Sequence, residues 1–457
     1  MDRILPNQRK HPAVWVPTLY FAEGVPYFVV NLMALIFYQR MGISNEVTTF
    51  ITGLLALPWV LKLFWSPFLE LYKTKKFFVL SMECLGGLSM GLLAFCLPSS
   101  NYFRYSICFL GLLALFSSTH DIAADGLYIS SLNPSERAAY AGWQSGFYNV
   151  ARFFVQGGLI IFAGFLEARM PIVKAWMIVF ALMGGILALL SLYHLRTLPR
   201  GAEAQPQKNL REIADTFGDV VLSFFKKPKI LLLLSFILLS RLGEGQILKI
   251  GPLFLKAARD SGGLGLSTAQ FGTVYGTLGT IAFVVGTLLG GQFAARAGLK
   301  RALAPLIVIL NLPTLVYVYL SIALPALPQQ ADGLGSLLFS TVTSALILEM
   351  FAYGFGFVSI IVLMMQEIAP GKYQTAHYAF ASALMNLGAI LPSAASGFIQ
   401  TRIGYRNFFI WALLCGIPAI VLSFLAPIVS RDGNAGSHHG IPEAGVEIPE
   451  EELVTRV

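Results

Sequence analysis

Two aspartates lie one helical turn apart inside a strongly apolar part of the sequence. Asp121 and Asp125 belong to the segment SSTHDIAADGLYISSL, residues 117–132, which follows the apolar run ICFLGLLALF. An ionised carboxylate at the centre of a membrane helix costs about 2.5–3.5 kcal/mol, so such a group nearly always faces a partner or a water-filled cavity. If the segment crosses a membrane, the pair predicts that this face of the helix borders a water-filled interior.

Ionisable side chains occur within other apolar stretches as well. Glu23, Lys62 and Asp121 lie about eight to thirteen residues from the same ends of their helices, which at about 1.5 Å per residue places them in one layer. Asp121 with Arg152, and Glu23 with Lys62, are the expected ion pairs. Each pair would either line a water-filled pathway through the helices or only hold the helices together.

Polar side chains follow one face of three expected helices, at intervals of three and four residues. Ser118 and Tyr128 share a face with the two aspartates, and Ser145 shares a face with Asn149, Arg152 and Gln156. Such stripes are typical of a bundle whose interior holds water. The predicted substrate and proton pathway comprises Glu23, Tyr27, Asn31, Lys62, Asp121, Asp125, Trp143, Asn149, Arg152, Gln156, Arg241, Glu244 and Glu349.

Several of these side chains also have plain structural interpretations. Arg241 and Glu244, three residues apart, would satisfy each other. Glu349 has no cation nearby in the sequence, which makes it a candidate proton carrier. His120 points about 100° away from the aspartate stripe, so we expect a packed, hydrogen-bonded side chain, and we expect the same of His377. Trp59, Trp143 and Tyr27 would either stack on sugar rings or simply fill the bundle.

The composition identifies the class of protein. Apolar residues make up 56% of the 457 residues and charged residues only 12%, whereas soluble domains have about 25% charged residues. The chain is therefore predicted to be an all-α polytopic membrane protein. Its four cysteines lie in apolar runs without paired spacing, so we expect small buried side chains and neither disulfides nor a metal site.

Twelve apolar runs are long enough to cross a bilayer, which takes about 20 residues each. They begin near Trp15, Val47, Phe77, Tyr105, Ala138 and Ala175, and again near Ile230, Thr268, Ala302, Ser336, Tyr373 and Asn407. We therefore expect two six-helix halves, residues 1–199 and 230–430. Between them lies a cytoplasmic linker, residues 200–229, with a helical pattern in LREIADTFGDVVLSFFKK. Residues 431–457 are expected to form a disordered cytoplasmic tail.

Basic residues are distributed unevenly between the two sides of the predicted membrane. Roughly nineteen Lys and Arg fall on the side of the termini and roughly eight on the other, which predicts that both termini are cytoplasmic. The net charge of +8 is thus explained by topology, and we expect no binding of nucleic acid.

The two halves repeat similar features at similar places. The first expected helix carries AEGVPYF and the seventh GEGQILK; the loops WSPFLELYKTKKF, residues 65–77, and GGQFAARAGLKRA, residues 290–302, occupy equivalent positions. An acid with several cations would tie helix ends together in one conformational state, although the cations would also anchor topology. The predicted cytoplasmic gate comprises Glu70, Lys75, Lys76, Glu136, Arg137, Gly291, Arg296, Gly298, Lys300 and Arg301.

The second of these loops resembles the G-x-x-x-D-R-x-G-R-R signature of the major facilitator superfamily, with Ala295 in place of the aspartate. Three segments of the first half resemble AmpG-type muropeptide permeases: YFAEGVPYF, LKLFWSPFLELY and SSTHDIAADGLYISSLNPSERAAYAGWQSG. The family's Trp-Ser-Pro, D-I-x-x-D and Glu-Arg elements match Trp65-Ser66-Pro67, Asp121-Ile122 with Asp125, and Glu136-Arg137. Glu70 and His120 depart from the family's usual aspartate and glutamine.

The resemblance implies a twelve-helix secondary transporter that takes up anhydromuropeptides, driven by protons, across a bacterial inner membrane. We expect a monomer with no cofactor and no enzymatic activity, whose partners are a small-molecule substrate, protons and the bilayer. Since relatives of the family include acetyl-coenzyme A transporters, an acyl-coenzyme A or another organic anion is the alternative substrate. A polytopic membrane transferase is the alternative of a different class, and a channel is a third. No Walker motif for ATP binding is visible.

Overall fold

The computed structural model describes residues 10–66, 69, 73–199, 210–323 and 336–425. These residues form helices and no strand. Eleven helical stretches are long and apolar enough to cross a membrane. The last, Ala376–Leu425, bends sharply at Gly404, where φ is +75°, and so contains two crossings. The predicted all-α, twelve-helix membrane fold is confirmed.

Six crossings precede the linker, and their starting points lie within about four residues of those predicted. They are built from α1 (Pro12–Phe28), η1 (Val29–Met33) and α2 (Ala34–Arg40); α3 (Asn45–Leu54) and α4 (Pro58–Trp65); α6 (Lys75–Cys96); α7 (Tyr102–Ser131); α8 (Pro134–Arg152), η2 (Phe153–Leu159) and α9 (Ile160–Glu167); and α10 (Ile172–Thr197).

Six more follow the linker helix α11 (Leu210–Phe225), which confirms the helical pattern predicted there. They are built from α12 (Ile230–Ser240) and α13 (Leu242–Lys256); α14 (Thr268–Phe271), η4 (Gly272–Gly279) and α15 (Thr280–Ala297); α16 (Leu299–Asn311) and α17 (Thr314–Ala323); α18 (Ser336–Leu363) and η5 (Met364–Ile368); and α19 (Gln374–Cys415) with α20 (Ile417–Leu425). A short 3₁₀ turn, η3 (Arg259–Ser261), lies between α13 and α14.

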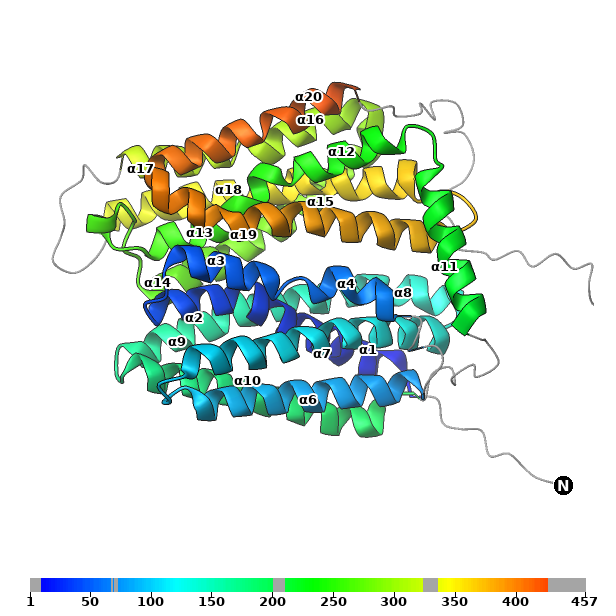
Figure 1. Cartoon of the computed structure of the whole chain (residues 1–457), viewed down its shortest axis with the longest axis horizontal. Helices are drawn as coiled ribbons and strands as arrows, with labels where there is room; N and C mark the ends of the chain where they lie inside the picture. The colour runs from blue at the N-terminus through cyan, green and yellow to red at the C-terminus, as the bar shows by residue number, and fades with distance from the viewer. Residues whose placement is uncertain (1–9, 67–68, 70–72, 200–209, 324–335, 426–457) are drawn as a thin grey trace, which may run out of the picture.

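Two bundles lie side by side with their helices roughly parallel, as Figure 1 shows. The helices before α11 form the lower bundle, and most of those after it form the upper one. Helix α11 runs across one end of the molecule, the end from which α1 starts. We call this the terminal end and the opposite one the far end.

Local sequence sets where several helices begin. Side chains of Ser44, Thr74, Asn133 and Ser267 accept hydrogen bonds from backbone N–H groups in the first turns of α3, α6, α8 and α14. These N–H groups have no partner within the helix, so a capping oxygen stabilises each start.

Apolar side chains cover the outside of the bundle. Phe95 is 80% exposed and Leu189 67% exposed, as expected where lipid rather than water is the solvent. Cys84 and Cys108 are exposed as well. The prediction that all four cysteines are buried is therefore wrong, because an apolar run in a membrane helix faces lipid on one side and protein on the other.

Candidate functional site

A cavity of about 440 Å³ lies between the two bundles. Its walls come from α1, α4, α7 and α8 on one side and from the first part of α19 on the other. The charged lining residues are Glu23, Lys62, Asp121 and Asp125. Each of these lies in the half of its membrane crossing that is nearer the terminal end. The structure thus brings together charged side chains that are up to 102 positions apart in the sequence.

Lys62 forms an ion pair with Asp121. The expected pairing of Asp121 with Arg152 and of Glu23 with Lys62 is therefore wrong. Glu23 lies beside Asp121 and Asp125 instead, and its Oε2 atom has no hydrogen-bond partner among the described residues. Three carboxylates consequently share one lysine.

Asp125 is held by neutral donors from two other helices. The Tyr20 hydroxyl of α1 donates to Asp125 Oδ1 at 3.1 Å, and Gln144 Nε2 of α8 donates to the same oxygen at 3.3 Å. The aspartate therefore fixes α7 against both neighbours while its side chain still lines the cavity.

A break in the second crossing positions Lys62. Helix α3 ends at Leu54, a turn follows, and α4 begins with Pro58 in its first position, where the missing N–H of proline costs nothing. The second crossing is therefore interrupted by a turn, and both Trp59 and Lys62 of α4 line the cavity.

Aromatic rings form a second part of the wall. Tyr27 meets Trp59 edge to face with ring centroids 5.1 Å apart, and Tyr148 lies 6.0 Å from Tyr27. Tyr378 of α19 completes this set from the other bundle. Rings of this kind present flat apolar faces with polar rims, which suit the faces of sugar rings as well as packing.

A smaller cavity of about 90 Å³ continues deeper, sharing Tyr27, Trp59 and Asn386 with the first. Its charged lining residues are Arg241 and Lys249. Arg241 forms an ion pair with Glu244, as expected from their spacing of three residues. Lys249 Nζ donates to the backbone carbonyl of Asn31 at 3.0 Å and so links the two bundles.

Other predicted pathway residues lie apart from these cavity walls. Arg152 donates to Gln156 Oε1 at 3.3 Å, and its guanidinium lies 4.1 Å from the ring centre of Phe283. Glu349 is buried, and its Oε2 atom has no hydrogen-bond partner among the described residues.

Two residues of α8 that were predicted to line the pathway, Trp143 and Asn149, do not belong to the cavity lining. Trp143 is 45% exposed and stacks on Phe147. Asn149 donates to the carbonyl of Ser145 on its own helix, and its neighbour Tyr148 lines the cavity instead.

Three polar residues of α19 line the larger cavity and were missed from the sequence. Tyr378, Ser382 and Asn386 are spaced by four residues each. The periodicity criterion that identified the stripes on the first, fourth and fifth helices would have found them. They were overlooked because none of them carries a charge.

The predicted gate residues of the first half mostly bind helix ends. Lys76 Nζ donates at 2.8 Å to the carbonyls of Leu195 and Leu198, at the end of α10. Glu136 caps the start of α8 together with Asn133. Lys75 donates to the carbonyl of Leu69 and Arg137 to that of Leu132. Glu70 lies outside the described residues.

In the second half, Gly298 ends α15 with φ of +75°, a conformation that favours glycine. Arg296, Lys300 and Arg301 are exposed around this turn. The nearest atom to a Cβ at Gly291 would be 3.8 Å away, so this glycine is not the point of close helix contact. At the preceding Gly290, a Cβ would overlap the carbonyl oxygen of Phe355 on α18.

At the far end, Glu167 joins the two bundles. It accepts from Arg40 at 3.0 Å and from Trp176 at 2.9 Å, both in the first bundle, and from the Thr268 hydroxyl of the second at 2.6 Å. Lys256 donates to that same hydroxyl oxygen at 2.8 Å.

A second far-end contact joins α3 to α19. Asn45 donates to Gln400 Oε1 at 2.7 Å and to the Tyr405 hydroxyl at 2.9 Å. Polar contacts thus join the two bundles at the far end.

Comparison with known proteins identifies the family. Residues 18–329 match the model of the Major Facilitator Superfamily. The chain is 24% identical over 430 residues to "Putative transporter AmpG 2" of Rickettsia typhi, covering 91% of this chain and 95% of the relative. It is 24% identical over 410 residues to "Anhydromuropeptide permease" of Escherichia coli K12, covering 88% and 77%.

Solved structures show the same fold at low identity. A bacterial homologue of the human lysosomal transporter Spinster, in an inward-facing and unoccupied conformation, superposes with a TM-score of 0.68 at 15% identity, covering 92% of this chain and 97% of that one. A proton-dependent oligopeptide transporter gives 0.64 at 15% identity, covering 90% and 98%. The resemblance to AmpG-type permeases is confirmed, and the chain belongs to the Major Facilitator Superfamily as a multi-pass membrane transporter.

Proposed function

We propose that the chain takes up anhydromuropeptides, the sugar–peptide fragments of peptidoglycan, coupled to protons, across a bacterial inner membrane. The single observation that carries the proposal is the cavity of about 440 Å³ between the bundles, in which Glu23, Asp121 and Asp125 share one lysine. A volume of this size falls within the roughly 300–1,000 Å³ typical of small-molecule sites. The similarity of the chain to the anhydromuropeptide permease of Escherichia coli supports the choice of substrate.

The excess of carboxylates supports proton coupling. Three ionised carboxylates beside one ammonium group would leave two uncompensated negative charges in a membrane interior, which is costly. A bound proton, or a cationic group of the substrate, would offset this charge. Glu23, with an oxygen that has no partner among the described residues, is our first candidate for the proton carrier, and Asp121 is the second. Glu349 is the third.

Alternating access would use the two halves as units. We propose that residues 1–199 and 230–430 rock against each other, with both termini cytoplasmic and a single chain sufficient. Since Glu167 and its partners join the bundles at the far end, the described conformation would be closed there and would face the cytoplasm. The basic residues around Gly298, with Lys75 and Lys76, would then belong to the gate at the terminal end.

Uptake into proteoliposomes tests the proposal. Purified protein is reconstituted, and entry of labelled anhydromuropeptide is measured with and without an inward proton gradient. We expect uptake that the gradient accelerates, and we expect Glu23→Gln, at the first candidate for the proton carrier, to abolish the acceleration. Asp260→Asn, which removes an exposed acid in a loop, is the matched control and should transport normally.

Absence of uptake under either condition would contradict the muropeptide assignment. One observation favours the alternative of an organic anion, because Arg241 and Lys249 both line the deeper cavity. Uptake of labelled acyl-coenzyme A by the same proteoliposomes, with no uptake of muropeptide, would establish that alternative.

A further inference from the structure

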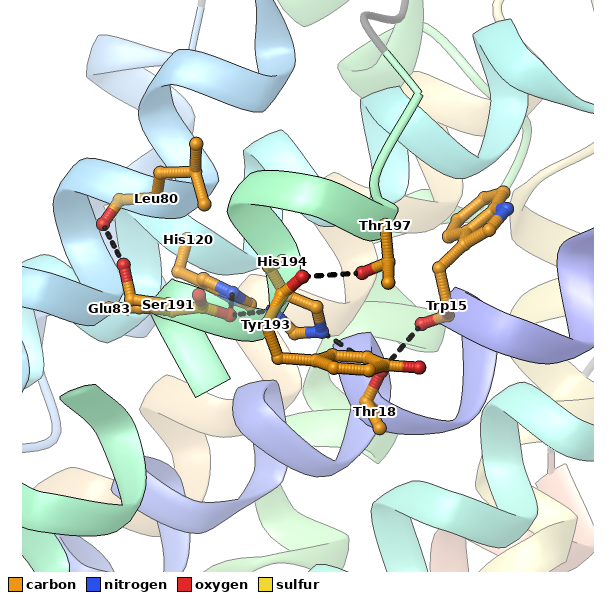
Figure 2. A network of polar contacts seen from close by, with 9 residues as sticks. All are labelled: Trp15, Thr18, Leu80, Glu83, His120, Ser191, Tyr193, His194 and Thr197. Atoms are coloured by element: carbon orange, nitrogen blue, oxygen red, sulfur yellow. Dashed lines mark hydrogen bonds and ion pairs between the residues drawn. The ribbon is translucent and has the colours of Figure 1, made fainter. Parts of the chain in front are cut away.

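Four helices meet at one buried carboxylate in the first bundle. Figure 2 shows His120 of α7 and His194 of α10 directed toward Glu83 of α6. Glu83 Oε1 lies 2.6 Å from His194 Nδ1 and 3.2 Å from His120 Nε2. All three side chains are at most 4% exposed. The contact confirms the packed, hydrogen-bonded state predicted for His120, whereas Glu83 and His194 were not singled out from the sequence.

The hydrogen bonds of His194 are compatible with two arrangements of the protons. His194 Nε2 lies 2.9 Å from Thr18 Oγ1 of α1, and that hydroxyl also lies 3.2 Å from the carbonyl oxygen of Trp15. A hydroxyl has only one proton to donate. If Thr18 donates it to Nε2, His194 is a neutral ring that donates from Nδ1 to an ionised Glu83. If Thr18 donates it to Trp15, Nε2 is the donor toward Thr18, and the 2.6 Å contact then requires a second proton on Nδ1 or on the carboxyl, because two bare acceptors would repel each other.

Electrostatics favours the arrangement with the additional proton. A lone ionised carboxylate enclosed in a membrane bundle would carry an uncompensated charge, which costs several kcal/mol. A proton on the pair makes its net charge zero, whichever atom holds it. The local charges reinforce this, because α7 carries Asp121 next to His120 and Asp125 one turn further on, and α1 carries Glu23 on its cavity side.

The other described side chains that line the small cavity beside the cluster carry no charge. Tyr193, next to His194, donates to the carbonyl of Val14 and is directed away from Glu83. The uncharged neighbours are Ala22 and Pro26 of α1, Met82 of α6, Leu113 and Ser117 of α7, and Leu187 of α10. No cation of the described residues therefore faces the carboxylate from these helices except a protonated histidine.

A small cavity of about 10 Å³ adjoins the cluster and is lined in part by Glu83, Ser117 and His120. Glu83 Oε2, Ser117 Oγ and His120 Nδ1 are buried and have no hydrogen-bond partner among the described residues. One water molecule needs about 10–15 Å³ and two to four polar partners. The cavity and its three polar atoms meet both conditions.

We propose that Glu83, His120 and His194 form an enclosed proton-binding site. One proton is held between Glu83 and His194, and one water molecule bridges Glu83, Ser117 and His120. The site joins α1, α6, α7 and α10 within one bundle and does not line the larger cavity. Its proton is therefore a fixed part of the first half, separate from any proton that the cavity carboxylates exchange during transport.

Nitrogen-15 NMR of histidine-labelled protein in lipid bilayers at pH 8 tests the site. The chain has six histidines, so the His194 signal can be assigned by subtraction with His194→Gln. Exposed histidines are neutral at this pH. We expect either a doubly protonated His194 ring or a carboxylic-acid infrared band that disappears in Glu83→Gln. A neutral His194 together with an ionised Glu83 would overturn the proposal.

Glu83→Gln provides the second readout, because an amide cannot hold the proton. A doubly protonated His194 in the wild type should become neutral in this variant, and a charged ring that persists would contradict the site. His377, buried and bonded to Ser223 at 3.0 Å, is the internal control and should not change. If Glu83→Gln does not fold, the nitrogen-15 spectrum of the wild type still reports the protonation of His194, and Glu83→Asp replaces Glu83→Gln in assigning the infrared band, which should then shift in frequency. The bridging water molecule is tested in the same samples by transfer of nuclear polarisation from water to the His120 ring. We expect such transfer, and its absence would show that no water molecule bridges Glu83, Ser117 and His120.

Discussion

At the scale of single residues, the partner of Lys62 determines the charge balance of the cavity. Glu23 and Asp121 lie at similar depth, so depth alone favours neither as the partner. Helix α4 packs against α7, and the flexible stem of Lys62 reaches Asp121. Glu23 is left beside two other carboxylates as a result.

Lys62→Met should destabilise the protein by leaving Asp121 without a counter-charge. In a double-mutant cycle, Asp121→Asn should cost less in the Lys62→Met background than in the wild type, with an interaction energy of about 0.5–3 kcal/mol. Thermal unfolding in detergent measures all four proteins. Additive effects of the two substitutions would show that the pair does not stabilise the fold. Lys174→Met, at an exposed lysine of α10, is the control.

At the scale of elements, π-helical turns mark the contact between the two bundles. η2 in the fifth crossing packs against η4 in the eighth, and η1 carries Asn31, whose carbonyl accepts from Lys249 of the other bundle. A π turn inserts one residue and widens a helix, so it shifts the side chains that follow. Gly276 of η4 lies so close to η2 that a Cβ there would overlap the carbonyl oxygen of Gln156.

Gly276→Ala should therefore disturb the contact between the bundles. Overpacking of this kind costs about 1–3 kcal/mol, and we expect a lower melting temperature in detergent. Gly185→Ala is the matched control, because a Cβ at this helical glycine of α10 would meet no atom within 4 Å. Equal melting temperatures for the two variants would contradict the tight contact between η2 and η4.

At the scale of the whole molecule, the polar contacts between the bundles described above cluster toward the far end. Glu167 of the first bundle binds Thr268 of the second, and Asn45 of the first binds Gln400 and Tyr405 of the second. These contacts have to break if the far side is to open. Their strength therefore contributes to the equilibrium between the two access states.

Glu167→Gln should shift that equilibrium toward a conformation open at the far end. Hydrogen bonds to a charged group contribute about 1.5–3 kcal/mol, so we expect the population ratio to change by roughly tenfold or more. Spin labels at positions 174 and 260, in a variant whose native cysteines have been replaced, report the separation by pulsed electron paramagnetic resonance. In Glu167→Gln, a larger share of the molecules should show a longer distance between the two labels than in the parent protein.

Arg169→Gln is the control for this measurement, because Arg169 lies at the same end and, among the described residues, contacts Phe165 of its own segment. Its distance distribution should equal that of the parent protein. An unchanged distribution in Glu167→Gln would show that this residue does not hold the far end closed.

The sequence by itself determined the twelve crossings, their starting points and the depth of the buried charges. Hydropathy and helical periodicity are local properties, so they can be read along the chain. The charged stripes of the first and fourth helices could be predicted for the same reason. The uncharged stripe of Tyr378, Ser382 and Asn386 follows the same spacing and was available to that criterion.

The tertiary structure alone decided which groups meet. Lys62 binds Asp121, Arg152 lies over Phe283, and Glu83 gathers two histidines. Each of these contacts depends on which helices are neighbours and on how each is rotated about its axis, and neither property is encoded in any single stretch of the chain. A buried charge makes a partner or a wet cavity energetically necessary, but only the packing of the helices selects which one.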